Sequence, residues 1–429
     1  MRITLRHLVL LAAPVASMAC EGLTDIQATD IVQPASLATA AGAEAQRAGA
    51  MGTFFTTYGG GVTSVVIASG LISDEFYAGF VPSTASTPDF RTWSEPSSIG
   101  PYVGLQRTRV AALVAIDGLK QYLPSPRSKT GQMYAIAGYT ETMLAETVCS
   151  GIPLGTLSGG GTEFGTPLST ADILALANQH FDSALVYAAD SARILNLARI
   201  GKGRALLDDA KYAAAAAAVT GVPTSYVYNA EYSAAVTGQG NQVYNTMTAI
   251  KLLGVSDKEG TNGLDFRSAN DPRVAWSALG KAADNATDQF VLSKMSSLAV
   301  PIVVASGVEA RLIEAEAQLN AGNAAGALAT LNALRASAIA PALAALTLEP
   351  DVTTQANQLF RERAFWLFGT GHRQGDLRRL IRQYNRAPES VFPTGAPRPG
   401  SVYGPQVAFV PDVTATNNPA YKACASLGA

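Results

Sequence analysis

Apolar side chains recur at helical spacing through the stretch 308–384, and this pattern determines the fold class. The first stripe, at i, i+4, i+7 and i+11, consists of Val308, Leu312, Ala315 and Leu319. Three further stripes consist of Ala327, Leu331 and Leu334, of Phe360, Ala364 and Leu367, and of Leu377, Leu380, Ile381 and Tyr384. Thr353 or Thr354 is positioned to cap the third helix. Paired helices of this length are the unit of tetratricopeptide-like arrays, in which neighbouring pairs stack to bury their apolar faces.

The same periodicity extends over most of the chain. Helix pairs are expected at about 102–149, 170–219, 306–340 and 351–386. Between the second and third pairs, a region at about 220–305 carries turn signals and alternating Tyr226, Tyr228 and Tyr232. The prediction is therefore a mainly α protein of tetratricopeptide-like helix pairs, with a loop-rich insertion carrying short strands, in one domain over 41–429.

The residues of the carboxy-terminal block resemble a family signature. The runs are 307–320 (GVEARLIEAEAQLN), 331–335 (LNALR), 361–369 (RERAFWLFG) and 373–380 (RQGDLRRL). In this order they are similar to the SusD/RagB family of surface lipoproteins, which capture nutrients, mostly glycans. The resemblance implies a SusD-like α-array that covers a partner, a SusC-like TonB-dependent transporter in the outer membrane.

The amino-terminal segment has the pattern of a targeting signal. Arg2 and Arg6 precede a short apolar run, and small residues lead to Ala19 and Cys20. We expect a lipoprotein signal peptide at 1–19, lipidation of Cys20, and a flexible tether at 20–40 that holds the body at the outer membrane, exposed at the cell surface. The alternative is an ordinary secretory signal with a cleavage site that lies near a cysteine.

Composition narrows the chemistry. Apolar residues make up 48% and charged residues 15% of the chain, which is enough for a large core. The formal charge of −2 gives no electrostatic case for nucleic acid. With three histidines, neither a His-rich metal site nor a cofactor site is expected. No motif singles out two carboxylates for a glycosidase, so we expect a protein that is not an enzyme.

The proline-broken loop 73–100 is the candidate ligand site, because its aromatic faces could stack on sugar rings. Trp93 is the best single candidate, and Phe90 and Tyr77 are the next two. The alternative is that these rings pin the loop to the core.

Once Cys20 carries lipid, two cysteines remain in an oxidising compartment, and we expect a disulfide between Cys149 and Cys424. The alternative is two unpaired cysteines, with Cys149 buried as a small apolar side chain.

A cluster of arginines lies on the last predicted helix: Arg373, Arg378, Arg379, Arg382 and Arg386. These side chains could bind phosphate, but pairing with Glu309, Glu314 and Glu316 of the neighbouring helix pair is the preferred interpretation.

The leading hypothesis for function is a surface lipoprotein that captures a glycan and delivers it to a TonB-dependent transporter. The alternative is a helical scaffold lipoprotein of a cell-envelope complex. The sequence does not identify which glycan is bound, or whether a peptide is bound instead.

Overall fold

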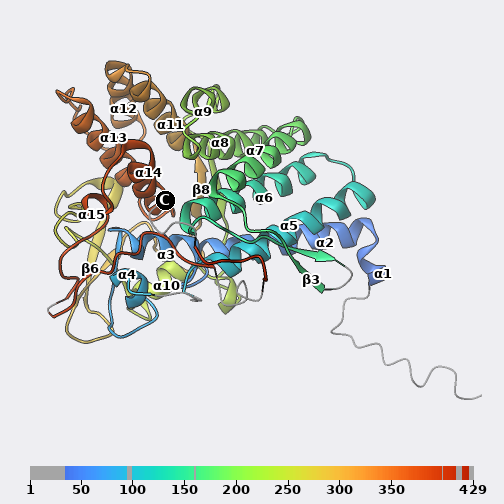
Figure 1. The fold of residues 1–429 in the computed structure, drawn as a ribbon, viewed down its shortest axis with the longest axis horizontal. Helices are drawn as coiled ribbons and strands as arrows, with labels where there is room; N and C mark the ends of the chain where they lie inside the picture. Colours follow the sequence, from blue (N-terminus) through green and yellow to red (C-terminus); the bar gives the residue numbers. More distant parts are fainter. Residues whose placement is uncertain (1–33, 94–98, 159–160, 399, 412–417, 425–429) are drawn as a thin grey trace, which may run out of the picture.

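The computed structural model describes residues 34–93, 99–158, 161–398, 400–411 and 418–424, and these form a stacked array of helices with short strands along one side (Figure 1). The expected fold class, mainly α with tetratricopeptide-like pairs, is confirmed. The predicted signal peptide, Cys20 and most of the predicted tether lie outside the described residues. Within the described residues, no helix has the length and apolar character needed to cross a membrane.

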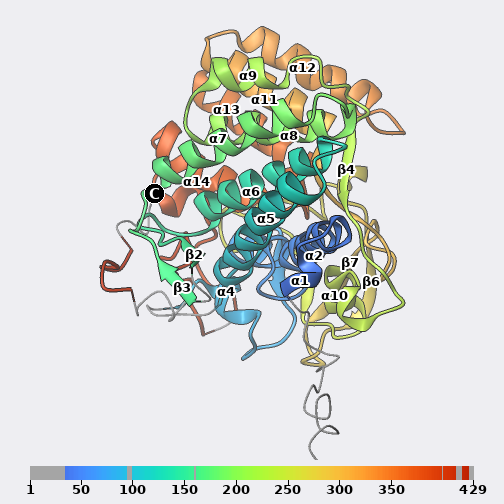
Figure 2. The ribbon, with the colours of Figure 1, turned by 90° about the vertical axis from the view of Figure 1, so that its right-hand side faces the viewer.

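The helix pairs follow one another along the array (Figure 2). The amino-terminal elements are α1 (Pro34–Leu37), α2 (Ala40–Gly59), α3 (Val65–Ile72) and α4 (Ser86–Phe90). The array continues with α5 (Tyr102–Tyr122), α6 (Ser128–Thr147), α7 (Thr170–Tyr187), α8 (Ala192–Asp208) and α9 (Tyr212–Val219). It ends with α11 (Gly307–Asn320), α12 (Ala324–Ser337), α13 (Val352–Trp366), α14 (Arg373–Tyr384) and α15 (Pro388–Val391). The region expected to hold the second pair thus contains a third, short helix, α9, which packs between α8 and α11.

Capping residues set where these helices begin. Ser169 and Asp172 form a reciprocal capping box at the start of α7. At the start of α13 the cap is Asp351, whose carboxylate accepts from the backbone N–H groups of Thr353 and Thr354. The expectation that one of these threonines caps the helix was wrong, because an aspartate one turn earlier provides the acceptor for both donors.

The strands pair two by two. The described residues contain four antiparallel two-stranded sheets: β1 (Phe76–Ala78) with β5 (Leu253–Val255), β2 (Gly155–Ser158) with β3 (Gly161–Phe164), β4 (Val227–Ala230) with β8 (Ile302–Ser306), and β6 (Trp276–Lys281) with β7 (Asp288–Leu292). The region from β4 to β8 also holds α10 (Gln242–Thr248) and two 3₁₀ turns. β8 leads directly into α11, so the insertion is joined to the array without a loop.

Close helix approach builds the core. The ring of Phe181 on α7 lies against Gly138 of α6 and Gly201 of α8. A Cβ atom added at Gly201 would lie 2.3 Å from that ring, so the aromatic side chain occupies the space that two glycines leave. A second, smaller core lies between α11, α12 and α13.

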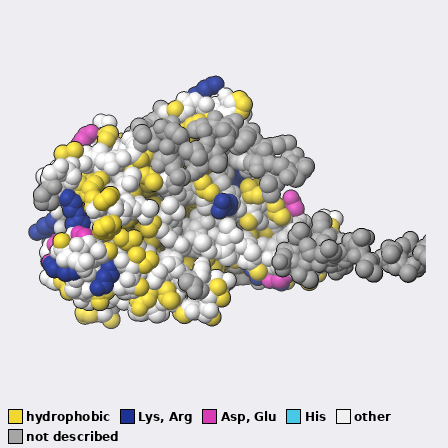
Figure 3. Space-filling view, turned by 90° about the horizontal axis from the view of Figure 1, so that it is seen from below, with side chains coloured by type: hydrophobic (Ala, Val, Ile, Leu, Met, Phe, Trp, Pro, Cys, Tyr) yellow, Lys and Arg dark blue, Asp and Glu magenta, His cyan; other side chains and the backbone are white. Residues whose placement is uncertain are grey.

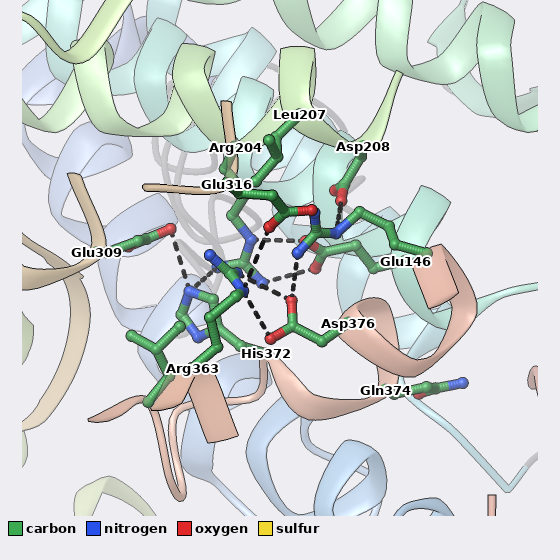
Figure 4. Close-up of polar contacts among 12 residues, drawn as sticks. Glu146, Arg204, Leu207, Asp208, Glu309, Glu316, Arg363, His372, Gln374 and Asp376 are labelled. Carbon is green, nitrogen blue, oxygen red and sulfur yellow. Dashed lines mark hydrogen bonds and ion pairs between the residues drawn. The ribbon is translucent and has the colours of Figure 1, made fainter. Parts of the chain in front are cut away.

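Buried charges join the two halves of the array (Figure 4). Arg204 of α8 forms two 2.6 Å bonds with the carboxylate of Glu146 on α6. Its remaining amino group lies 2.8 Å from Nε2 of His372, which lies 3.1 Å from Glu309 at the start of α11. Burial, and next the charge of Arg204, lower the pKa of His372, so this histidine is a neutral acceptor for the guanidinium.

The second part of this network centres on Asp376 of α14. Arg363 of α13 forms two 2.9 Å bonds with this carboxylate, and Arg379 donates to it at 2.7 Å. Arg379 also pairs with Glu316 of α11 and, at 3.2 Å, with Asp208 at the end of α8. Burial alone raises the pKa of Asp376, but the two guanidinium groups outweigh it and hold the pKa below the usual range.

The arginine cluster of α14 is therefore mainly structural, although its partners differ in part from those expected. Arg379 binds Glu316 as expected, whereas Glu309 contacts His372 and Glu314 pairs with Arg311 of its own helix. Arg378 uses one amino group to donate to the carbonyls of 145, 146 and 148, which end α6 without helical partners. Burial lowers the pKa of Arg378 to about 9.

A disulfide joins Cys149, at the end of α6, to Cys424 near the carboxy terminus, with 5.7 Å between their Cα atoms. Cys149 is fully buried, and its N–H donates to the carbonyl of Phe409. The bond thus fastens the last described residues to the same helix end that Arg378 caps.

Replacing Arg379 with Met should lower the free energy of unfolding by about 3–5 kcal/mol, because Glu316 and Asp376 would each lose a buried partner. Arg361→Met, on the neighbouring α13, is the control: its pair with Asp265 is partly exposed, and its loss should cost at most about 1 kcal/mol. Urea unfolding of both variants measures the difference. Equal costs would contradict a structural role for the buried network.

Reducing the disulfide, or replacing Cys424 with Ser, should lower the midpoint of thermal unfolding. The loop closed by the bond spans 275 residues, for which the chain-entropy model gives an upper estimate of about 5 kcal/mol. Peptide mapping without reductant should recover the two cysteines in one linked fragment. Alkylation of both thiols in denatured, unreduced protein would show that the bond is not formed.

Candidate functional site

Two hollows lie on either side of α2, and the first faces β4. This tyrosine hollow has a volume of about 600 Å³, within the range of ligand sites. Its polar and aromatic lining consists of Arg47, Phe55, Gln132, Arg193, Tyr228, Glu231, Tyr232 and Gln239. These side chains come from α2, from the first turns of α6 and α8, and from β4 with the loop that follows it. Figure 2 shows α2 and β4 on the same side of the molecule.

A stacked guanidinium forms one wall of the tyrosine hollow. Arg193 lies with its guanidinium carbon 4.5 Å from the ring centre of Tyr228, which is 1% exposed. The Tyr228 hydroxyl accepts from Gln132 at 2.7 Å, and Tyr226 donates to the backbone carbonyl of Arg193 at 2.7 Å. Arg193 is exposed and has no carboxylate partner among the described residues, so its N–H donors are available to a ligand.

The other cation of this hollow is already paired. Arg47 bonds to both carboxylate oxygens of Glu44 and to the side-chain oxygen of Gln132. The half-buried rings of Phe55 and Tyr232 lie beside it, and Tyr232 donates to the Phe55 carbonyl at 3.0 Å. Burial raises the pKa of Tyr232, so its hydroxyl stays protonated. The tyrosine hollow therefore offers apolar ring faces next to neutral and cationic hydrogen-bond donors.

The second, threonine hollow lies on the other side of α2 and has a volume of about 720 Å³. Hydroxyl groups, glycines and one cation line it: Gly52, Thr53, Thr56, Thr57, Gly60, Gly61, Thr63, Ser64, Gly100, Val103, Gly104 and Arg107. No acidic side chain is among these lining residues. Its chemistry therefore favours polar ligands and negative charge.

The structure contradicts the expectation that Trp93 stacks on ligand. Trp93 is 7% exposed, and its ring stacks on that of Phe409 with 5.1 Å between centres and 14° between planes. Gln406 also bonds to its backbone carbonyl. The indole pins the loop to the carboxy-terminal segment, because burial against another ring stabilises it more than exposure to water would.

The other two predicted residues line neither hollow. The Tyr77 hydroxyl donates to the carbonyl of Asp288 and accepts from the N–H of Phe290, and its ring covers Gly254, so it joins β1 to β5 and β7. Phe90 is half-buried at the end of α4, where its carbonyl accepts from Gly404. A ligand role for Tyr77 and Phe90 stays a prediction, and their observed contacts are structural.

The described histidines are held by carboxylates rather than arranged for catalysis. Nδ1 of His180 lies 2.7 Å from Glu141, which also binds Arg109, and His372 belongs to the buried network. No group of three His, Cys, Asp or Glu residues suited to a metal occurs in the described part of the chain. The hollows themselves can bind a ligand by stacking, hydrogen bonding and charge.

The lower face of the molecule gives no single-sign surface. Figure 3 shows basic side chains gathered toward the end of the molecule that carries β6, where they are mixed with apolar and acidic ones. Exposed apolar residues on or next to the β strands include Phe80, Ile250 and Leu279. This mixture differs from the continuous basic face that nucleic acid would require.

Sequence reasoning missed most of the hollow residues, although it noted the alternating Tyr226, Tyr228 and Tyr232. The remaining signal was weak: Gly49 and Gly52 were interpreted only as residues that lower helix propensity. In the structure Gly52 lines both hollows.

Residues 309–416 match the family model described as the SusD family. No curated protein matches the chain. Three solved structures resemble it. A SusD-like carbohydrate-binding protein from Bacteroides vulgatus ATCC 8482 has a TM-score of 0.61 and 14% identity, covering 79% of this chain and 83% of that one. A laminarin-binding SusD-like protein has a TM-score of 0.60 and 16% identity, covering 83% and 96%. NanU of B. fragilis has a TM-score of 0.63 and 13% identity, covering 92% and 99%. At these identities the likeness shows the fold.

Proposed function

We propose that this chain, a SusD/RagB family member by the match of residues 309–416 and by its fold, captures a glycan at the cell surface and delivers it to a TonB-dependent transporter. It acts without catalysis and without a cofactor. The observation that carries the proposal is the tyrosine hollow, in which Phe55 and Tyr232 lie beside the free guanidinium of Arg193. Ring faces and convergent hydrogen-bond donors are what sugar rings and hydroxyls require.

Two of the similar structures are described as binding carbohydrate or laminarin, and this supports a glycan as the ligand class. The alternative, a helical scaffold lipoprotein of a cell-envelope complex, would bind protein on the outer faces of the helix pairs. It would leave a polar and aromatic hollow of about 600 Å³ without a role. Glycan capture therefore accounts for more of the structure.

Purified protein without the amino-terminal segment should bind at least one member of a soluble oligosaccharide panel in calorimetry. Phe55→Ala should weaken that binding by about tenfold, the scale of one aromatic contact. Phe80→Ala is the control, because Phe80 is an exposed ring outside both hollows. If no oligosaccharide binds, the proposed function is wrong; equal losses in both variants would place the site elsewhere.

The lipid anchor and the transporter partner are part of the same proposal. Diacylated Cys20 would hold the protein at the outer membrane, and a SusC-like transporter would lie beneath it. Wild-type protein should sediment with outer membranes and co-purify with a transporter after mild detergent extraction. Cys20→Ala should be recovered in the soluble fraction, with its thermal unfolding unchanged. A Cys20→Ala protein that still sediments with membranes would contradict the anchor.

A further inference from the structure

The tyrosine and threonine hollows meet on the surface of α2. Gly52, Thr56 and Gly60 line both of them. At i, i+4 and i+8 these residues form one line along the helix, with Phe55 on one side and Thr57 on the other. The boundary between the hollows is therefore a ridge of small residues.

The ridge is open at Gly52. A Cβ atom added there would meet no atom within 4 Å, and the residue is exposed. Thr56, one turn later, is also exposed. No bulky side chain on the ridge separates the hollows, so a chain-like ligand can cross from one to the other.

The threonine hollow has polar groups left for a ligand. Ser64 is 4% exposed, yet its hydroxyl has no hydrogen-bond partner among the described residues. A buried polar group without a partner is costly, and a ligand that bonds to it removes that cost. By contrast, the Thr57 hydroxyl is already used, because it bonds to Thr108 and to the carbonyl of Gly104.

The charge of the threonine hollow comes from Arg107. This residue is exposed and has neither an ion pair nor a hydrogen bond to the described residues, and no acid lines the hollow. A guanidinium in this setting presents its fork of N–H donors to a carboxylate or sulfate without competition from a protein acid.

We propose that the threonine hollow is a second subsite, which receives the continuation of a glycan chain across the Gly52 ridge and binds an acidic sugar unit through Arg107. This inference rests on the proposed function and adds the ligand class: an oligosaccharide long enough to span both hollows and carrying carboxylate or sulfate groups. A disaccharide fills the tyrosine hollow alone.

The first test blocks the ridge. Gly52→Phe places a ring in the open space between the hollows, while Gly49→Phe places one on the same helix at an exposed site that lines neither hollow and also meets no atom. Both changes replace glycine in a helix, so neither should impair folding. Affinity for acidic hexasaccharides should fall by about tenfold or more in Gly52→Phe only, with disaccharide binding unchanged. Equal affinity of Gly52→Phe and Gly49→Phe for hexasaccharides would overturn the spanning site.

The second test removes the charge. Calorimetry would use hexamers of galacturonate, of sulfated galactose and of neutral glucose, with Arg127→Gln as the exposed-arginine control. Arg107→Gln should weaken binding of an acidic hexamer by about tenfold, leave the neutral hexamer unaffected, and reduce the loss of affinity as salt rises from about 0.05 to about 0.5 M. The galacturonate and sulfated arms distinguish the two acidic groups.

The outcomes separate the two proposals. If Phe55→Ala abolishes binding while Gly52→Phe and Arg107→Gln do not affect it, the second subsite is wrong and the proposed function stands. If Arg107→Gln affects neutral and acidic hexamers equally, the acidic class is wrong. If no probe binds to the wild-type protein, the proposed function fails and this inference fails with it.

Discussion

The pairing of Arg379 and Arg363 with Asp376 and Glu316 is the constraint on which the helical array depends. These four side chains come from α11, α13 and α14, and Arg379 also reaches Asp208 of α8. Each is at most 4% exposed, so each charge has lost its water and relies on its partners. A helix pair that shifted along its neighbour would leave a buried charge unpaired, at a cost of several kcal/mol. The network therefore specifies how the pairs stack, which apolar stripes alone leave loosely determined.

The same use of charge extends to the ends of elements. Arg373 forms two bonds with Asp74 in the segment after α3, and Arg378 satisfies the last carbonyls of α6. The disulfide then fastens the carboxy-terminal residues next to that helix end. As a result, α14 is in contact with α3, α6 and the neighbouring helix pairs at once. This rigidity matters for binding, because a site built on helices keeps its geometry when the ligand arrives.

The hollows use the framework differently. Their walls come from the sides of α2 and the first turns of α6 and α8, with β4 opposite, and their charges are the few that the interior leaves free. Arg193 and Arg107 are exposed and have no carboxylate partner among the described residues, whereas most arginines of α13 and α14 are paired inside. The division between paired interior arginines and free surface arginines separates stability from recognition.

The sequence by itself determined the helical stripes, the cap at Ser169 and the family signature of the carboxy-terminal block, because periodicity and short motifs are local properties of the chain. It also indicated that the arginines of α14 form ion pairs, since acids of matching number lie on the neighbouring helices. It could not decide which arginine meets which acid, because that depends on how two helices are rotated against each other. It misplaced the ligand role of Trp93 for the same reason: whether a ring faces water or Phe409 depends on a segment more than 300 residues away. Only the tertiary structure brought Gly52, Arg107 and Arg193 to the same part of the surface, because the hollows are formed by elements that are distant in sequence and share no local pattern.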